Sequence, residues 1–212
     1  MVFKYLFCSF IVFLSIITYP GYISKNCVSV PPGGISGFWY SVSQLQNFKN
    51  KEYFCASSGC LAVMAKDLDL HKVYSLAKSS KDKYNSFNDI KNSFINKLVA
   101  NINYIPDVSI VTMNNIGYCI ERKPSNKKEL RTLLIKTTDI PILVKNTFRE
   151  IDGGLCYYYL NNCKYRINFP LNYKFLTNIF NVDITNEDLI YFYNYTSNYR
   201  MNLIIPEKYY DQ

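Results

Sequence analysis

The sequence predicts an α/β fold, a three-layer α/β/α arrangement around a mostly parallel central sheet, and two observations support that prediction. Short apolar runs of strand length alternate along the chain with longer segments whose apolar residues recur at helical spacing. The chain has 212 residues, 49% of them hydrophobic, with 20 Tyr and 14 Phe, which is enough apolar surface for one large core. This composition excludes a disordered chain. In such a fold we expect the functional site at the carboxyl ends of the strands.

Residues 1–24 form an N-terminal hydrophobic segment that is expected to be helical. The run from Tyr5 to Ser24 holds 20 uncharged residues, which as a helix can cross a hydrocarbon layer of roughly 30 Å. Three interpretations stay open: a signal anchor, a cleaved signal peptide, or a buried element of the domain. We favour the anchor, which predicts a membrane-associated protein, whereas the signal peptide predicts a secreted or lumenal one. Residues 25–212 are expected to form a single domain.

The elements of that domain follow from local patterns, apolar residues at helical spacing for helices and short apolar runs for strands. Either Ser125 or Asn126 is expected to cap the helix at 127–136. After a turn at Asp152 we expect a hairpin around Asn161-Asn162, and the aromatic segment beyond Pro170 is expected to close the sheet. In chain order, the expected elements are strand 27–30, helix 38–48, strand 52–56, helices 59–78 and 87–98, strands 108–113 and 117–121, helix 127–136, and a strand that ends at 151.

The net charge of +8 suits an anionic partner surface, either lipid or nucleic acid. Basic residues are spread over 66–97 and 122–136, and no tight basic run is interleaved with aromatic residues. We therefore expect a membrane surface, and no nucleic acid, as the partner. The sequence does not indicate an oligomeric state.

Cysteine usage argues against a zinc site. The chain has seven cysteines without a C-x-x-C spacing, and His71 is its single histidine. We interpret most of the thiols as small buried apolar groups, and the register of the expected hairpin does not pair Cys156 with Cys163. The redox compartment stays open.

The eight glycines of the chain are unevenly placed. Six of them lie at three short stretches, namely Gly33, Gly34 and Gly37; Gly59; and Gly153 with Gly154. Glycine is needed where φ is positive or where the backbone closely approaches another group. The three stretches therefore indicate three special backbone sites.

The second stretch, Cys55-Ala56-Ser57-Ser58-Gly59, places a serine between a strand and a helix. It is close to the G-x-S-x-G elbow, in which a nucleophilic serine is exposed at the top of a sheet, although Cys55 stands at the first glycine position. Ser57 would attack an acyl carbonyl, and backbone N–H groups of Gly33, Gly34 and Ser58 would hold the oxyanion.

A nucleophilic serine needs a base. His71 lies 14 residues after Ser57, near the far end of the helix expected there, and at 1.5 Å per residue it would be about 21 Å away. We interpret His71 as a surface or helix-end residue, where a positive charge suits the helix dipole. Asp152, on its glycine turn, is the best remaining base, although an Asp-Gly pair is also a common turn former. The expected site is a serine–aspartate dyad.

Taken together, the three stretches resemble those of the patatin-like phospholipases. That family has an oxyanion loop D-G-G-G-x-[RK]-G after the first strand, a G-x-S-x-G elbow after the second, and a D-G-G or D-G-A turn. The corresponding stretches here are 31–37 (PPGGISG), 55–59 (CASSG) and 152–154 (DGG), and 137–141 (TTDIP) resembles the small-residue stretch that usually precedes the turn. The resemblance spans about residues 26–170.

The resemblance implies that Ser57 is the nucleophile, Asp152 its base, and Gly33 and Gly34 the oxyanion loop. The reaction would be hydrolysis of an acyl ester of a phospholipid or glyceride, without a metal or cofactor. Three departures favour an alternative, a weakened domain that binds lipid without efficient turnover. Pro32 lacks an N–H donor, Ser36 stands where a basic residue is common, and Cys55 replaces a glycine.

Overall fold

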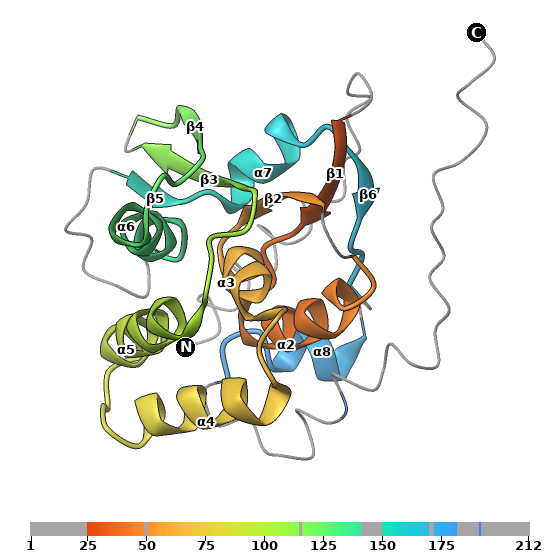
Figure 1. Ribbon diagram of the computed structural model, residues 1–212. Coiled ribbons are helices and arrows are strands. Elements are labelled where there is room, and N and C mark those ends of the chain that lie inside the picture. The colour runs from red at the N-terminus through yellow and green to blue at the C-terminus, as the bar shows by residue number, and fades with distance from the viewer. Residues whose placement is uncertain are drawn as a thin grey trace, which may run out of the picture.

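The computed structural model describes residues 25–48, 51–114, 116–140, 150–169, 172–181 and 191. The hydrophobic segment 1–24 and most of the chain beyond 181 lie outside these residues, so the predictions made for them are not tested. The described part is an α/β protein with seven helices and a six-stranded mixed sheet whose strands are mostly parallel (Figure 1). None of these helices is long and apolar enough to span a bilayer.

The sheet has the strand order β4-β3-β2-β1-β6, and β5 pairs with β3 beside that path. β1 pairs in parallel with β2 and β6, and β2 pairs in parallel with β3, whereas β4 and β5 run antiparallel to β3. The elements are β1 (Lys25–Val30), α2 (Gly34–Leu45), β2 (Glu52–Ala56), α3 (Ser58–Ala65), α4 (Leu70–Lys81), α5 (Phe87–Asn101), β3 (Val108–Asn114), β4 (Cys119–Arg122), α6 (Lys127–Thr137), β5 (Glu150–Asp152), α7 (Gly154–Leu160), β6 (Cys163–Arg166) and α8 (Tyr173–Thr177).

Strand β3 carries two partners on one edge. Its first half pairs with β2, which ends where Ala56 lies beside Val111. Its second half pairs with β5, beginning where Thr112 lies beside Asp152. Because β4 occupies the other edge of β3, β5 continues beyond the end of β2 along the same edge. The residue after β2 and the last residue of β5 are therefore brought together.

Helices cover both faces of the sheet. Along β2, Tyr53 and Cys55 point into the larger core, whereas Phe54 and Ala56 point into a smaller one, as the two-residue period of a strand requires. The larger core packs against α2, α3, α5 and α6, and the smaller core packs against α7. The site lies beside the larger core, at the carboxyl ends of the parallel strands β1 and β2.

Three of the expected elements differ in the structure. The helix expected at 59–78 is two helices, because the Asp69 carboxylate accepts the Lys72 N–H and caps a new helix at that point. The predicted hairpin after Asp152 is wrong: the segment is helix α7, whose buried Tyr157 packs under the sheet against Phe54. The segment expected to close the sheet begins with helix α8, which packs on α2, and the edge strand beside β1 is β6.

The interpretation of most thiols as separate buried groups is also wrong. Six of the seven cysteines form three disulfides, Cys27–Cys163, Cys55–Cys60 and Cys119–Cys156. As expected, Cys156 does not pair with Cys163. The first disulfide links β1 to the edge strand β6, the second links β2 to α3, and the third links β4 to α7.

Candidate active site

Ser57 lies in the turn between β2 and α3, and its backbone is strained. Its φ of 52° and ψ of −135° make it the one non-glycine residue with positive φ in the described part of the chain. Such a conformation costs about 1–3 kcal/mol and persists only where neighbouring groups impose it. Here the Thr137 hydroxyl does so, because Oγ1 accepts the Ser57 N–H at 2.9 Å and donates to the Val111 carbonyl at 2.6 Å.

The Asp152 carboxylate lies near the Ser57 side chain, whose hydroxyl acts on it as a hydrogen-bond donor and lowers its pKa. The same carboxylate accepts the Gly154 N–H at 2.6 Å, and the Asp152 N–H donates to the Asp139 carbonyl at 3.0 Å. The residue as a whole keeps some exposure, but its carboxyl group is deep enough that desolvation raises its pKa from 3.8 to about 6. The hydrogen bonds from Ser57 and Gly154 act in the opposite direction, as does the charge of Lys91.

A buried ion pair lies beside the dyad. Lys91 of α5 contacts the Asp139 carboxylate at 2.7 Å, and both side chains are almost fully buried. Asp139 thus connects to the dyad through its backbone carbonyl and to Lys91 through its side chain. Removing either partner would leave a buried charge without its counterion.

The glycine loop after β1 approaches the serine turn. The Gly33 N–H donates to the Ser58 hydroxyl at 3.1 Å, and the Ile35 N–H donates to the Ile179 carbonyl at 2.7 Å. Gly34 has a φ of +60°, and a Cβ built on it would lie 2.1 Å from the Ile179 oxygen, so glycine is required there on both counts. Two N–H groups of the loop therefore already have acceptors.

The other predicted motif residues flank these groups. Ser58 is the first residue of α3 and is buried, Gly59 follows it in the same turn, and Gly37 lies within α2. Gly153 separates β5 from α7, which begins at Gly154. A Cβ on Gly153 would lie 2.2 Å from the Val111 carbonyl, so only glycine lets this turn pass so close to β3. The structure thus brings all three stretches together at the carboxyl ends of the parallel strands β1 and β2.

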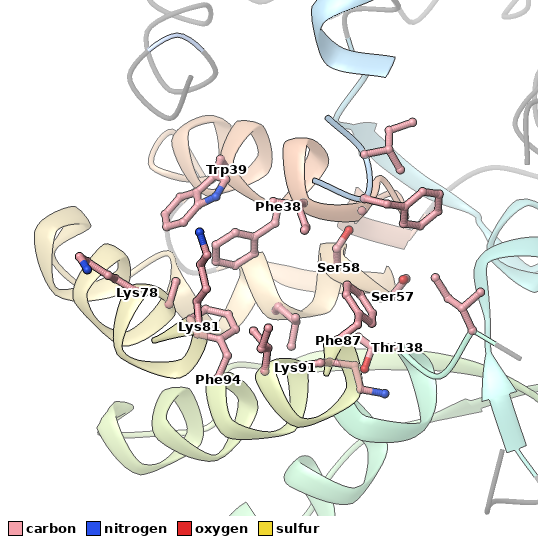
Figure 2. Close-up of a pocket in the computed structure, with 18 of the residues that line it drawn as sticks. Phe38, Trp39, Ser57, Ser58, Lys78, Lys81, Phe87, Lys91, Phe94 and Thr138 are labelled. Carbon is pink, nitrogen blue, oxygen red and sulfur yellow. The ribbon is translucent and has the colours of Figure 1, made fainter. Parts of the chain in front are cut away.

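An apolar cavity of about 250 Å³ opens beside Ser57. Figure 2 shows Ser57 and Ser58 at one end of it and Lys78 and Lys81 at the other. Asp152 is not among the residues that line the cavity. The apolar side chains along its length come mainly from α2 and α5, and include Phe38, Trp39, Phe87, Ile90 and Phe94.

Sequence reasoning placed His71 at the surface correctly but missed several residues of the site. His71 is exposed and lies at the N-terminal end of α4, where a positive charge does not suit the helix dipole, so only the dipole argument made for it fails. Thr137, Asp139 and Lys91 were not proposed, although 137–141 was noticed for its likeness to a family stretch. No local signal pairs Lys91 with Asp139, because 48 positions separate them.

A scan of the sequence against protein-family models and a search of curated proteins both found no match. Among the described residues, no group of three or more His, Cys, Asp and Glu side chains is arranged to hold a metal ion.

Proposed function

We propose that the chain is a lipid acyl hydrolase of the patatin-like type, built as a three-layer α/β/α domain with a Ser57–Asp152 dyad. The observation that carries the proposal is the placement of Ser57, in a strained turn at one end of an apolar cavity, near a desolvated Asp152 carboxylate whose pKa its hydroxyl lowers. A serine in a strained turn between strand and helix is the arrangement expected of a nucleophile. A base with a pKa of about 6 is ionised at neutral pH and still basic enough to take a proton.

The reaction divides into two steps. Ser57 Oγ attacks the carbonyl carbon of an acyl ester while its proton passes to Asp152, and the alcohol leaves with that proton as the acyl-serine ester forms. Water then attacks the acyl-serine ester, Asp152 takes a proton from the water, and the proton returns to Ser57 as the fatty acid is released. Backbone N–H groups at 33, 34 and 58 are the candidate donors to the oxyanion.

The cavity supports an acyl chain as the part of the substrate that is bound. Its walls are aromatic and aliphatic, and it runs away from Ser57. About 250 Å³ is small beside the roughly 300–1,000 Å³ of drug-sized ligand sites. We therefore infer that one acyl chain is held at a time. The membrane surface is the proposed source of that chain, which suits a net charge of +8.

The disulfides bear on where the domain works. Three disulfides in a domain of this size are typical of an oxidising compartment. We infer that residues 25–212 lie outside the cytosol, either tethered by the N-terminal segment or released as a secreted or lumenal protein. The two alternatives differ in whether segment 1–24 is retained.

One observation favours a second candidate function, lipid binding with little turnover. The N–H groups of Gly33 and Ile35 are already bonded, to the Ser58 hydroxyl and the Ile179 carbonyl. Pro32 supplies no N–H, and Ser36 is committed to the Phe175 carbonyl. A reaction that uses the Gly33 N–H as an oxyanion donor would have to displace it from the Ser58 hydroxyl, and loss of one oxyanion donor costs about 3–4 kcal/mol of transition-state stabilisation.

Labelling with a fluorophosphonate probe separates the two functions. The wild-type protein is expected to be labelled, Ser57→Ala not at all, and Asp152→Asn about a hundredfold or more slowly, because a general base contributes roughly 10²–10⁴-fold. Ser75→Ala, at an exposed serine of α4, is the matched control and should label like the wild type. A folded wild-type protein that binds vesicles but resists the probe would refute the hydrolase and favour the binding domain.

A further inference from the structure

The Cys55–Cys60 disulfide encloses the serine turn. Cys55 is the residue before the last of β2, Cys60 lies in the first turn of α3, and Ser57 stands between them. Only 5 positions separate these two cysteines, against 136 for the Cys27–Cys163 pair. Among the disulfides of the described residues, this is the one that joins the two sides of the serine turn directly.

The turn needs constraint because Ser57 adopts a conformation that L-residues avoid. Its N–H is held by Thr137, and its carbonyl accepts the Cys60 N–H at 3.0 Å. In a G-x-S-x-G elbow the first glycine relieves crowding at the turn. Here a cysteine occupies that position, and its side chain is bonded to the far end of the turn.

The location of the disulfide indicates a local role. Both cysteines are fully buried in the larger core, so neither is accessible to thiols in solution. In the chain-entropy model, a disulfide that closes a short loop restricts the unfolded chain much less than one that closes a long loop. Cys55–Cys60 should therefore contribute less to global stability than Cys27–Cys163, and its main effect should fall on the geometry of the turn.

We propose that the Cys55–Cys60 disulfide is a positioning element that replaces the turn glycine and holds the Ser57 hydroxyl against Asp152. The inference rests on the proposed function, in which Ser57 is the nucleophile. The disulfide touches no substrate and acts through the backbone of the turn. Small misplacements of a reacting atom have large kinetic effects, so a relaxed turn should slow the chemistry while the apolar cavity still binds.

The test compares two double variants. Cys55→Ala/Cys60→Ala should lower the rate of fluorophosphonate labelling by about ten- to a hundredfold and reduce kcat for a soluble ester with little change in KM. Cys27→Ala/Cys163→Ala is the matched control, because it also removes one disulfide, but one that links β1 to β6 and not β2 to α3. The control should show the larger fall in Tm and nearly wild-type labelling. If the Cys55→Ala/Cys60→Ala variant labels like the wild type, the positioning role is refuted.

A third variant guards against a misfolded turn. Cys55→Gly/Cys60→Ala places glycine at the elbow position and should recover part of the labelling rate that Cys55→Ala/Cys60→Ala loses. A labelling rate no higher than that of Cys55→Ala/Cys60→Ala would count against the idea that the disulfide takes the place of the turn glycine.

A readout independent of activity separates this inference from the proposed function. Titration of the ¹³C-labelled Asp152 carboxyl group reports how closely the Ser57 hydroxyl is held to it, because that hydroxyl lowers the pKa of Asp152. In Cys55→Ala/Cys60→Ala the pKa should rise above the wild-type value of about 6, whereas the control should keep it. If the wild type does not react with the fluorophosphonate probe but the pKa of Asp152 still rises in Cys55→Ala/Cys60→Ala, only the hydrolase is refuted. An unchanged pKa in that variant would refute the positioning role.

Discussion

Replacing Asp152 with Asn should stabilise the fold at neutral pH, because an ionised carboxylate at this position opposes folding. Burial raises the pKa of Asp152 from 3.8 to about 6. Below pH 3.8 the group is protonated in both the folded and the unfolded protein, and its titration has no effect on stability. As the pH rises from 3.8 to 6, the unfolded chain loses the proton first, so the free energy of unfolding falls.

The size of the effect follows from the shift. A difference of about two units, at 1.36 kcal/mol per unit, corresponds to about 3 kcal/mol. The amide oxygen introduced by Asp152→Asn can still accept the Gly154 N–H, so the variant keeps much of the local geometry. We expect the stability of Asp152→Asn relative to wild type to increase by about 3 kcal/mol between pH 3.5 and pH 7.

Urea unfolding of both proteins at a series of pH values measures this difference directly. Glu121→Gln, which removes an exposed carboxylate from β4, corrects for the general effect of removing a negative charge from a chain of net charge +8. A difference between Asp152→Asn and wild type that stays constant across this pH range would refute the assignment of a desolvated base.

Three further predictions concern the surroundings of the dyad. Thr137→Val should lower the free energy of unfolding by about 2–5 kcal/mol, because it leaves the Ser57 N–H and the Val111 carbonyl without the Thr137 hydroxyl. Thr137→Ser keeps both hydrogen bonds and should lose less. Urea unfolding measures both variants, and an equal loss of stability in the two would contradict the role of the hydroxyl. Lys91→Met should move the acidic limit of the pH–rate profile to higher pH, because the Lys91 charge lowers the pKa of Asp152. It should also destabilise the fold by about 3–5 kcal/mol, because Asp139 loses its buried counterion. An unchanged pH–rate profile would show that Lys91 does not act on Asp152. Alkylation of the denatured, unreduced protein should leave the six cysteines of the three disulfides unmodified, as mass spectrometry can show, and modification of Cys55 or Cys60 would remove the basis of the positioning role.

Local sequence was sufficient to predict those parts of the site that depend on glycine. Few residues tolerate positive φ or a backbone approach such as that of Gly153 to β3, so clustered glycines in a glycine-poor chain point to such places. The alternation of strand-length apolar runs with helical segments likewise predicted a mostly parallel sheet, which the structure has.

The parts that were not predicted depend on contacts between distant residues. An Asp-Gly pair is a common hairpin signal, but here Asp152 accepts the Gly154 N–H and Tyr157 packs under the sheet, which favours helix α7. The pairing of cysteines depends on which strands become neighbours, and spacing alone does not reveal it. The ion pair of Lys91 with Asp139 is of the same kind.

The shared edge of β3 has a consequence for how this site tolerates change. Ser57 and Asp152 are placed by adjacent positions, Val111 and Thr112, so the separation of the two groups is fixed by a single residue step of one strand. Segments that join these strands can lengthen or shorten at the surface without altering that step. A slip of β5 by one position, in contrast, would turn Asp152 to the opposite face of the sheet and abolish the dyad at once. The spacing of the proposed dyad therefore depends on strand register and not on the length of the connecting loops.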